Sequence, residues 1–346
     1  MLSIWLTVIL VSVSEYYSIL AEVHVGTAIN VFSRYGYLSI SMRVIPRNDS
    51  DRSWIFREPT VEVFANMSNE ENIKRSVNKN EAFKGDFHME FCDNVIQLLQ
   101  AYFRDFSVER LEKPWKAFTA SWSKNIVARN LGISSSYVNN LHDNCFVLIR
   151  VARHREVATM SSIDRMTPDE IIVDDSVQKQ IEDIKVGDSS SVVEFIRSFG
   201  SHYITSYVTG NALYQVFVYE PERYRIIKER LRKKGIDKIP SSELTEYFSP
   251  LNARHIGRIL SASGNETVES WASRKLQMSF FPVPYPSLLK LHSNSKLLYE
   301  LNGLLGNEAL LRLDLKTLAP AFKDIRKRDW FHQVLDNHLR LWEVNM

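Results

Sequence analysis

The sequence predicts an α+β fold from three kinds of hydrophobic spacing. Residues 35–45 alternate between apolar and polar side chains, which predicts a half-buried strand, and residues 145–151 form a short apolar run typical of a buried strand. Between them, apolar side chains in residues 89–111 recur every three or four positions, which predicts an amphipathic helix. Strand-like and helix-like segments follow one another irregularly, and this favours α+β over repeated βαβ units.

The remaining elements are predicted in chain order from the same patterns. Residues 54–64 are expected to form a strand, and the polar segment 168–188 and the short segment 192–199 are expected to be helical. A strand should then run to Tyr219, followed by a very basic helix over 221–235. Leu-rich helices are expected in the last 60 residues, where the apolar stripe from Trp330 to Trp342 predicts core packing, with partner or membrane docking as the alternative.

The first residues indicate export from the cell. Residues 2–13 are nearly all apolar, as in the hydrophobic region of a secretory signal peptide, and fall short of the about 20 residues of a membrane-spanning helix. No Lys or Arg precedes the run. We assign residues 1–21 to a signal peptide, with cleavage after Ser14 or Ala21. An N-terminal strand or an uncleaved anchor is the alternative.

Two further features agree with a secreted, extracellular protein. Asn48, Asn66 and Asn265 each begin an Asn-x-Ser/Thr sequon, so we expect at least one N-linked glycan. The two cysteines, Cys92 and Cys145, suit one disulfide in an oxidising compartment. Two buried free thiols are the alternative.

Composition narrows the possible partners. The apolar and charged fractions, 45% and 24%, are those of a globular protein, and the net charge is only +2. Nothing in this balance indicates a nucleic-acid partner or strong overall attraction to membranes. We therefore expect no nucleic-acid binding.

One short motif carries a family resemblance. Residues 199–203, Phe-Gly-Ser-His-Tyr, resemble the signature of the membrane-attack-complex/perforin (MACPF) superfamily, and the flanking segments 195–197 and 204–205 are also similar to it. The resemblance implies a bent, twisted four-stranded antiparallel sheet flanked by two helical clusters. This MACPF-like domain would span residues 22–285, with a C-terminal helical extension over 286–346. Family members usually carry two adjacent glycines at the bend, where this chain has Gly210 followed by Asn211.

The signature does not predict an enzyme. Ser201 and His202 are neighbours, and on a strand their side chains should point to opposite faces, so they should not form a nucleophile–base pair. We expect Gly200 at a tight turn, and His202 and Tyr203 in structural roles. No histidine pair has a metal-ligand spacing such as His-x-x-x-His, so we expect no metal and no cofactor.

The charge pattern also argues against pore formation. In lytic members of the superfamily the helical clusters refold into membrane hairpins, whose strands need about 9–11 residues with one apolar face. Residues 223–234 would place charges on both faces of such a strand. The first cluster, around residues 171–181, is less charged. We therefore expect a non-lytic protein, with a perforin-type immune pore former as the alternative.

The same basic segment suggests a docking surface. We expect its cations to form either a solvated helix face or a patch that binds anionic matrix, sulfated glycan or acidic lipid headgroups. These cations are Arg223, Arg225, Lys228, Arg230, Arg232, Lys233 and Lys234.

The resemblance also implies a kind of partner. Within the superfamily it is closest to a short insect member that acts in developmental signalling, through localised activation of a receptor tyrosine kinase in the embryo. An extracellular signalling ligand or receptor is the partner that this resemblance implies, and we expect retention at the cell surface or in the extracellular matrix.

Overall fold

The computed structural model describes residues 25–32, 63–65, 73–77, 86–119, 122–139, 144–160, 171–279, 284–292 and 294–345. The expected signal peptide, the strand predicted over 35–45 and the sequons at Asn48 and Asn66 lie outside the described residues, as does nearly all of the strand predicted over 54–64.

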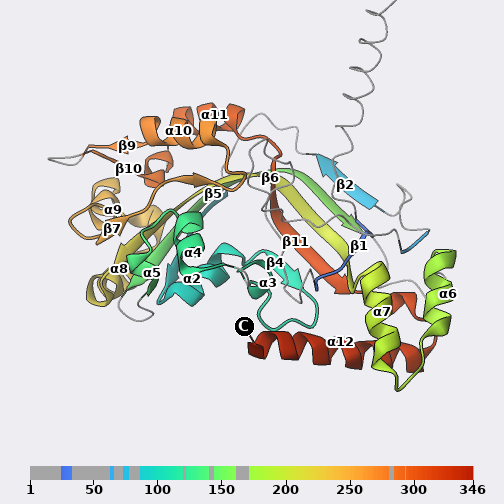
Figure 1. Ribbon diagram of the computed structural model, residues 1–346. Coiled ribbons are helices and arrows are strands. Elements are labelled where there is room, and N and C mark those ends of the chain that lie inside the picture. The colour runs from blue at the N-terminus through green and yellow to red at the C-terminus, as the bar shows by residue number, and fades with distance from the viewer. Residues whose placement is uncertain are drawn as a thin grey trace, which may run out of the picture.

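Two long antiparallel strands form the centre of the molecule (Figure 1). They are β5 (Cys145–Met160) and β6 (His202–Tyr219), and their pairing runs from Cys145 opposite Tyr219 to Thr159 opposite Ser206. A register shift between His154 and Glu156 interrupts the ladder on β5. Such an irregularity bends a strand and increases its twist, and the sheet in Figure 1 is strongly curved.

The sheet contains nine strands within the described residues, so the predicted count of four is wrong. Short strands line up in series along the two long ones. Strands β3 (Asp86–Cys92) and β2 (Ile73–Val77) pair with β5. Strands β1 (Ala28–Ile29), β11 (Ala309–Thr317), β8 (Leu260–Ser261) and β7 (His255–Ile256) pair with β6, and β4 (Phe106–Val108) lies parallel to β11.

Helices cover both faces of this sheet, because consecutive residues of β5 belong to different cores: Leu148 to one and Ile149 to the other. The first core contains residues of α2 (Val95–Tyr102), α4 (Lys124–Leu131), α7 (Ser189–Phe199) and α12 (Ile325–Asn345). The second contains residues of α8 (Pro221–Lys234), α9 (Ser241–Tyr247), α10 (Glu266–Lys275) and α11 (Ser295–Leu304). The shorter elements are α3 (Lys116–Thr119), α5 (Ser136–Asn139), α6 (Asp175–Asp183) and the β9–β10 pair (Gln277–Met278, Tyr285–Pro286).

The helices before and after β6 lie at opposite ends of the sheet (Figure 1). Helices α6 and α7 connect the end of β5 to the start of β6, whereas α8 follows the end of β6. Because Cys92 pairs with Phe146 and Cys145 pairs with Tyr219, α2 begins at the same end of the sheet as α8. The helical cluster at the same end of the sheet as α8 therefore runs from α2 to α5. The segment around residues 171–181, which was expected to be the first cluster, lies at the other end.

Two predicted helical regions contain strands instead. The segment 89–111 divides into the end of β3, helix α2 and strand β4, because the side chain of Asn94 accepts a hydrogen bond from the backbone N–H of Gln97 and starts the helix there. In the last 60 residues, β11 separates α11 from α12 and pairs with β6. Strand β11, which lies within the expected C-terminal extension, is thus part of the central sheet.

The predicted disulfide is absent: Cys92 and Cys145 are both buried free thiols. Cys92 lies directly opposite Phe146, and both side chains belong to the first core. Cys145 precedes Phe146 on β5, and its side chain belongs to the second core. The two sulfurs thus lie on opposite faces of the sheet, because successive residues of a strand point in opposite directions.

Candidate functional site

The signature segment connects three parts of the chain that are distant in sequence. Gly200 follows α7 with φ 93°, and a Cβ at this position would come within 2.8 Å of the backbone of Ile29. Ser201 N donates to Ile29 O (3.0 Å), and Ser201 O accepts from Leu318 N (3.0 Å). The signature therefore fixes β1 and the end of β11 against the start of β6.

The side chains of Ser201 and His202 contact each other, contrary to the expectation from strand alternation. Ser201 Oγ lies 2.9 Å from His202 Nδ1, because Ser201 precedes the first residue of β6 and is not constrained by the pleat. His202 Nε2 lies 3.0 Å from Glu109 O. A carbonyl oxygen only accepts, so Nε2 carries the hydrogen and Nδ1 accepts from the serine hydroxyl.

This Ser–His pair is enclosed within the fold. Both side chains are 0% exposed, so no substrate reaches the hydroxyl. Burial lowers the pKa of His202 to about 4, so the imidazole is neutral at physiological pH. The pair therefore links β6 to the segment that follows β4.

The bend of the sheet lies where Gly210 of β6 pairs with His154 of β5. A Cβ at Gly210 would overlap the backbone carbonyl of Arg153, so only glycine fits this close approach of the two strands. The next residue, Asn211, is 0% exposed and occupies the position where the family usually has a second glycine.

Asn211 forms four hydrogen bonds that join the bend to two other segments. Its Nδ2 donates to Ser263 Oγ (2.8 Å) and to Glu308 Oε2 (3.2 Å). Its Oδ1 accepts from the backbone N–H groups of Ala212 (2.8 Å) and Ser263 (3.2 Å). All the donors and acceptors of this buried amide are therefore occupied.

Two arginines of β5 extend these contacts. Arg153, which is buried, donates to the backbone carbonyl of Asn302, and Arg155 Nη2 donates to that of Leu305 (2.8 Å). Burial lowers the pKa of both guanidinium groups. We call this set the bend network: the side chains of Arg153, Arg155, Asn211, Ser263 and Glu308 with the carbonyls of Asn302 and Leu305.

Sequence reasoning found only Asn211 of this network. Arg153 and Arg155 follow a mostly apolar run in β5 and were a visible signal, since charges that are buried in a strand need specific partners. The partners themselves come from segments about 50 to 150 positions away, which sequence spacing does not bring together.

Helix α8 presents its basic residues to solvent. Its apolar side, Tyr224, Ile227 and Leu231, is buried in the second core. Three of its seven predicted docking cations form ion pairs: Lys228 with Asp93 (2.7 Å), and Arg230 and Lys234 with Glu243 (2.9 and 3.8 Å). The other four are exposed and have no ion pair among the described residues: Arg223, Arg225, Arg232 and Lys233.

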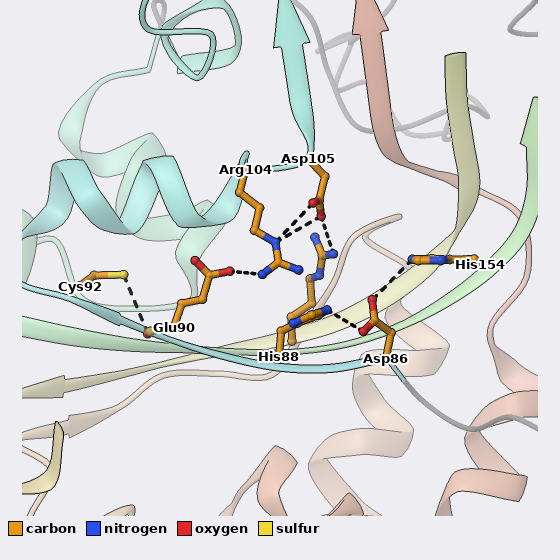
Figure 2. Close-up of polar contacts among 8 residues, drawn as sticks. Asp86, His88, Glu90, Cys92, Arg104, Asp105 and His154 are labelled. Carbon is orange, nitrogen blue, oxygen red and sulfur yellow. Dashed lines mark hydrogen bonds and ion pairs between the residues drawn. The ribbon is translucent and has the colours of Figure 1, made fainter. Parts of the chain in front are cut away.

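A polar cluster that the sequence did not predict lies on the sheet beside α2 (Figure 2). Asp105 pairs with Arg150 (2.6 Å) and with Arg104, which also pairs with Glu90 (2.6 Å). Burial alone would raise the pKa of Asp105, but the two guanidinium groups outweigh it and lower the pKa. Asp86 lies between His88 and His154. The two arginines offset the charges of Glu90 and Asp105, which suits a structural network.

The sequon at Asn265 lies at the start of α10. Asn265 Oδ1 caps the helix by accepting from Thr267 N (3.0 Å) and Val268 N (3.3 Å), and the residue is half-buried. Its Nδ2, the atom that would carry a glycan, has no hydrogen-bond partner in the described part of the chain.

The described residues contain neither a cluster of metal-ligating side chains nor a helix that could span a membrane. No group of three or more His, Cys, Asp or Glu side chains there is arranged to hold a metal ion. No described helix combines the length and the apolar character needed to cross a membrane.

Comparison with solved structures gives distant structural neighbours. No protein-family model and no curated protein matches the chain. Similar solved structures include GNIP1Aa from Chromobacterium piscinae, with 9% identity and a TM-score of 0.49, covering 93% of this chain and 56% of that one. They also include a cell invasion protein with a MAC/perforin domain from Bacteroides thetaiotaomicron (10% identity, TM-score 0.42, 92% and 63% covered).

A third neighbour is astrotactin-2, described as a vertebrate-specific, perforin-like membrane protein involved in neuronal development. It shows 12% identity and a TM-score of 0.34, with 81% of this chain and 92% of that chain covered. The present chain spans less than two thirds of the first two neighbours. MACPF and perforin-like proteins are thus among its structural neighbours, at similarities too low to assign a function.

Proposed function

We propose that this chain is a MACPF-type protein that is secreted and acts in extracellular developmental signalling without piercing membranes. The signature at residues 199–203 and the bent sheet support the superfamily. The sequence also resembles the insect torso-like protein, which permits localised activation of the receptor tyrosine kinase Torso by its ligand Trunk in terminal patterning of the embryo.

The bend network is the observation that carries the non-lytic part of the proposal. A lytic rearrangement requires the sheet to open at its bend. At that point Asn211 bonds to Ser263, and Arg153 and Arg155 bond to the backbone carbonyls of the 302–305 segment. Opening would break several buried hydrogen bonds, and each buried group left unsatisfied costs about 1–3 kcal/mol. The network therefore opposes the movement that pore formation needs.

The composition of α8 supports the same conclusion. Refolded as a strand, it would place charged residues on both faces, and a lysine or arginine near the bilayer midplane costs about 2–4 kcal/mol. Its apolar residues Tyr224, Ile227 and Leu231 already fill the second core. Exposing them to refold would remove about 1.5–3 kcal/mol of burial for each aliphatic side chain.

Signalling is tested with the secreted chain in a receptor assay. Conditioned medium that contains the chain should increase phosphorylation of a Torso-type receptor on cells supplied with a Trunk-type ligand, and the chain should co-precipitate with one of the two. Absence of the protein from the medium, or unchanged receptor phosphorylation with no co-precipitation, would contradict the proposal.

A further inference from the structure

The cations of helix α8 divide into two rows on either side of its buried face. Positions three, four or seven apart lie on one side of a helix, so Arg225, Lys228 and Arg232 form one row and Arg223, Arg230 and Lys234 form the other. In the second row, Glu243 forms ion pairs with both Arg230 and Lys234. In the first row only the central Lys228 is paired, with Asp93.

The first row therefore offers two exposed guanidinium groups without ion pairs in the described structure, at Arg225 and Arg232. They are seven residues apart, which places them roughly 10 Å from each other along the helix axis. Among the described residues, neither guanidinium group has a hydrogen-bond or ion-pair partner. They are consequently available to an external ligand with regularly spaced negative charges.

From this we infer that α8 binds a sulfated polysaccharide of the extracellular matrix through Arg225 and Arg232. The inference rests on the extracellular location proposed above. Guanidinium groups bind tetrahedral oxyanions through paired N–H donors, which gives arginine an advantage over lysine at such a contact.

The side of α8 that faces away from the core, with Glu222, Ile226 and Glu229, favours binding of a linear polymer over binding of a lipid surface. Glu222 and Glu229 are exposed and lie one row outward from Arg225 and Arg232. A flat anionic membrane would meet these carboxylates together with the arginines, whereas a linear chain can follow the arginine row alone. Among the apolar residues of this side, only Ile226 is exposed (49%), and interfacial helices need a wide apolar face.

Binding of the purified full chain to immobilised heparin tests the inference. Replacing Arg225 and Arg232 with Ser should weaken binding at least about tenfold, because two direct charge contacts are lost. The matched control is R223S/K233S, which removes the same charge from the same helix and should weaken binding less than about threefold. Thermal melting of both variants should equal that of the native chain, since none of the four residues forms an ion pair in the described structure.

Three results would overturn the inference. The native chain could fail to bind heparin, or both variants could weaken binding equally, which would indicate non-specific attraction to charge. Tighter binding to phosphatidylserine vesicles than to heparin, lost in R225S/R232S, would identify a lipid surface instead. The heparin assay needs neither receptor nor signalling ligand. A negative result in it would therefore contradict the glycan site without contradicting the proposed signalling function.

Discussion

The Nδ2 atom of Asn211 donates a 2.8 Å hydrogen bond to Ser263 Oγ across the bend of the central sheet, between residues 52 positions apart. Asn211→Ala would remove the hydrogen bonds of this buried amide to buried Ser263 and half-buried Glu308. We expect the free energy of unfolding to fall by about 3 kcal/mol. Chemical denaturation measures it, with exposed Asn307→Ala as the control expected to change little. A loss no larger than that of the control would show that the network does not hold the bend.

Gly210 gives a second test at the same place. In Gly210→Ala the new methyl group would overlap the carbonyl of Arg153 in the adjacent strand, so we expect severe destabilisation and little secreted protein. The matched change Gly303→Ala meets no atom within 4 Å and lies in helix α11. It should be neutral or stabilise by up to about 1 kcal/mol. Equal yields of the two variants would contradict the close approach.

The buried imidazole of His202 predicts that the stability of the fold depends on pH. Its folded pKa of about 4 lies below the ordinary value of 6.5, so the unfolded chain takes up a proton in this interval and the folded chain does not. The stability from the neutral imidazole is therefore complete above pH 6.5 and lost progressively towards pH 4, by about 3 kcal/mol.

Denaturation of native protein and His202→Gln between pH 4 and 7 checks this. The variant should lose stability less steeply on acidification, whereas exposed His338→Gln should follow the native curve. Parallel curves for the native protein and His202→Gln would show that His202 does not titrate as the structure requires.

The two cysteines should behave as protected thiols. Burial, with the nearby Glu90 and Asp93, raises the pKa of Cys92 to about 12, and burial also raises that of Cys145. Iodoacetamide without reductant should modify neither cysteine in native buffer and both in denaturant, as intact mass would show. If denatured protein reacts only after reduction, the cysteines form a disulfide after all.

Much of the fold follows from local sequence pattern. Helix α7, strand β6 and helix α8 agree with the predicted segments, because each combines a clear period with a terminal signal: Gly200 after α7, and Pro221 at the start of α8. Strand β11 was missed although residues 311–316 alternate between Leu and charged side chains. The Leu-rich composition of that region favours helix, and it competes with the period of two that indicates a strand.

The bend network lay beyond sequence reasoning for a different reason. Arg153, Asn211, Ser263 and Glu308 belong to four separate segments, and only the register between β5 and β6, with the loops packed against them, brings these side chains together. The missing disulfide has a similar cause. Whether Cys92 and Cys145 point to the same face of the sheet depends on which residue of β5 lies opposite Cys92. That register is a property of the folded sheet.

Release of an encapsulated dye from anionic liposomes tests the central claim most directly. The purified chain should cause no more leakage than buffer across a range of concentrations, while a known lytic relative in the same vesicles should release the dye. Robust leakage that rises with assembly of the chain into oligomers would contradict the account, because it would show that the bend opens despite the contacts of Asn211, Arg153 and Arg155.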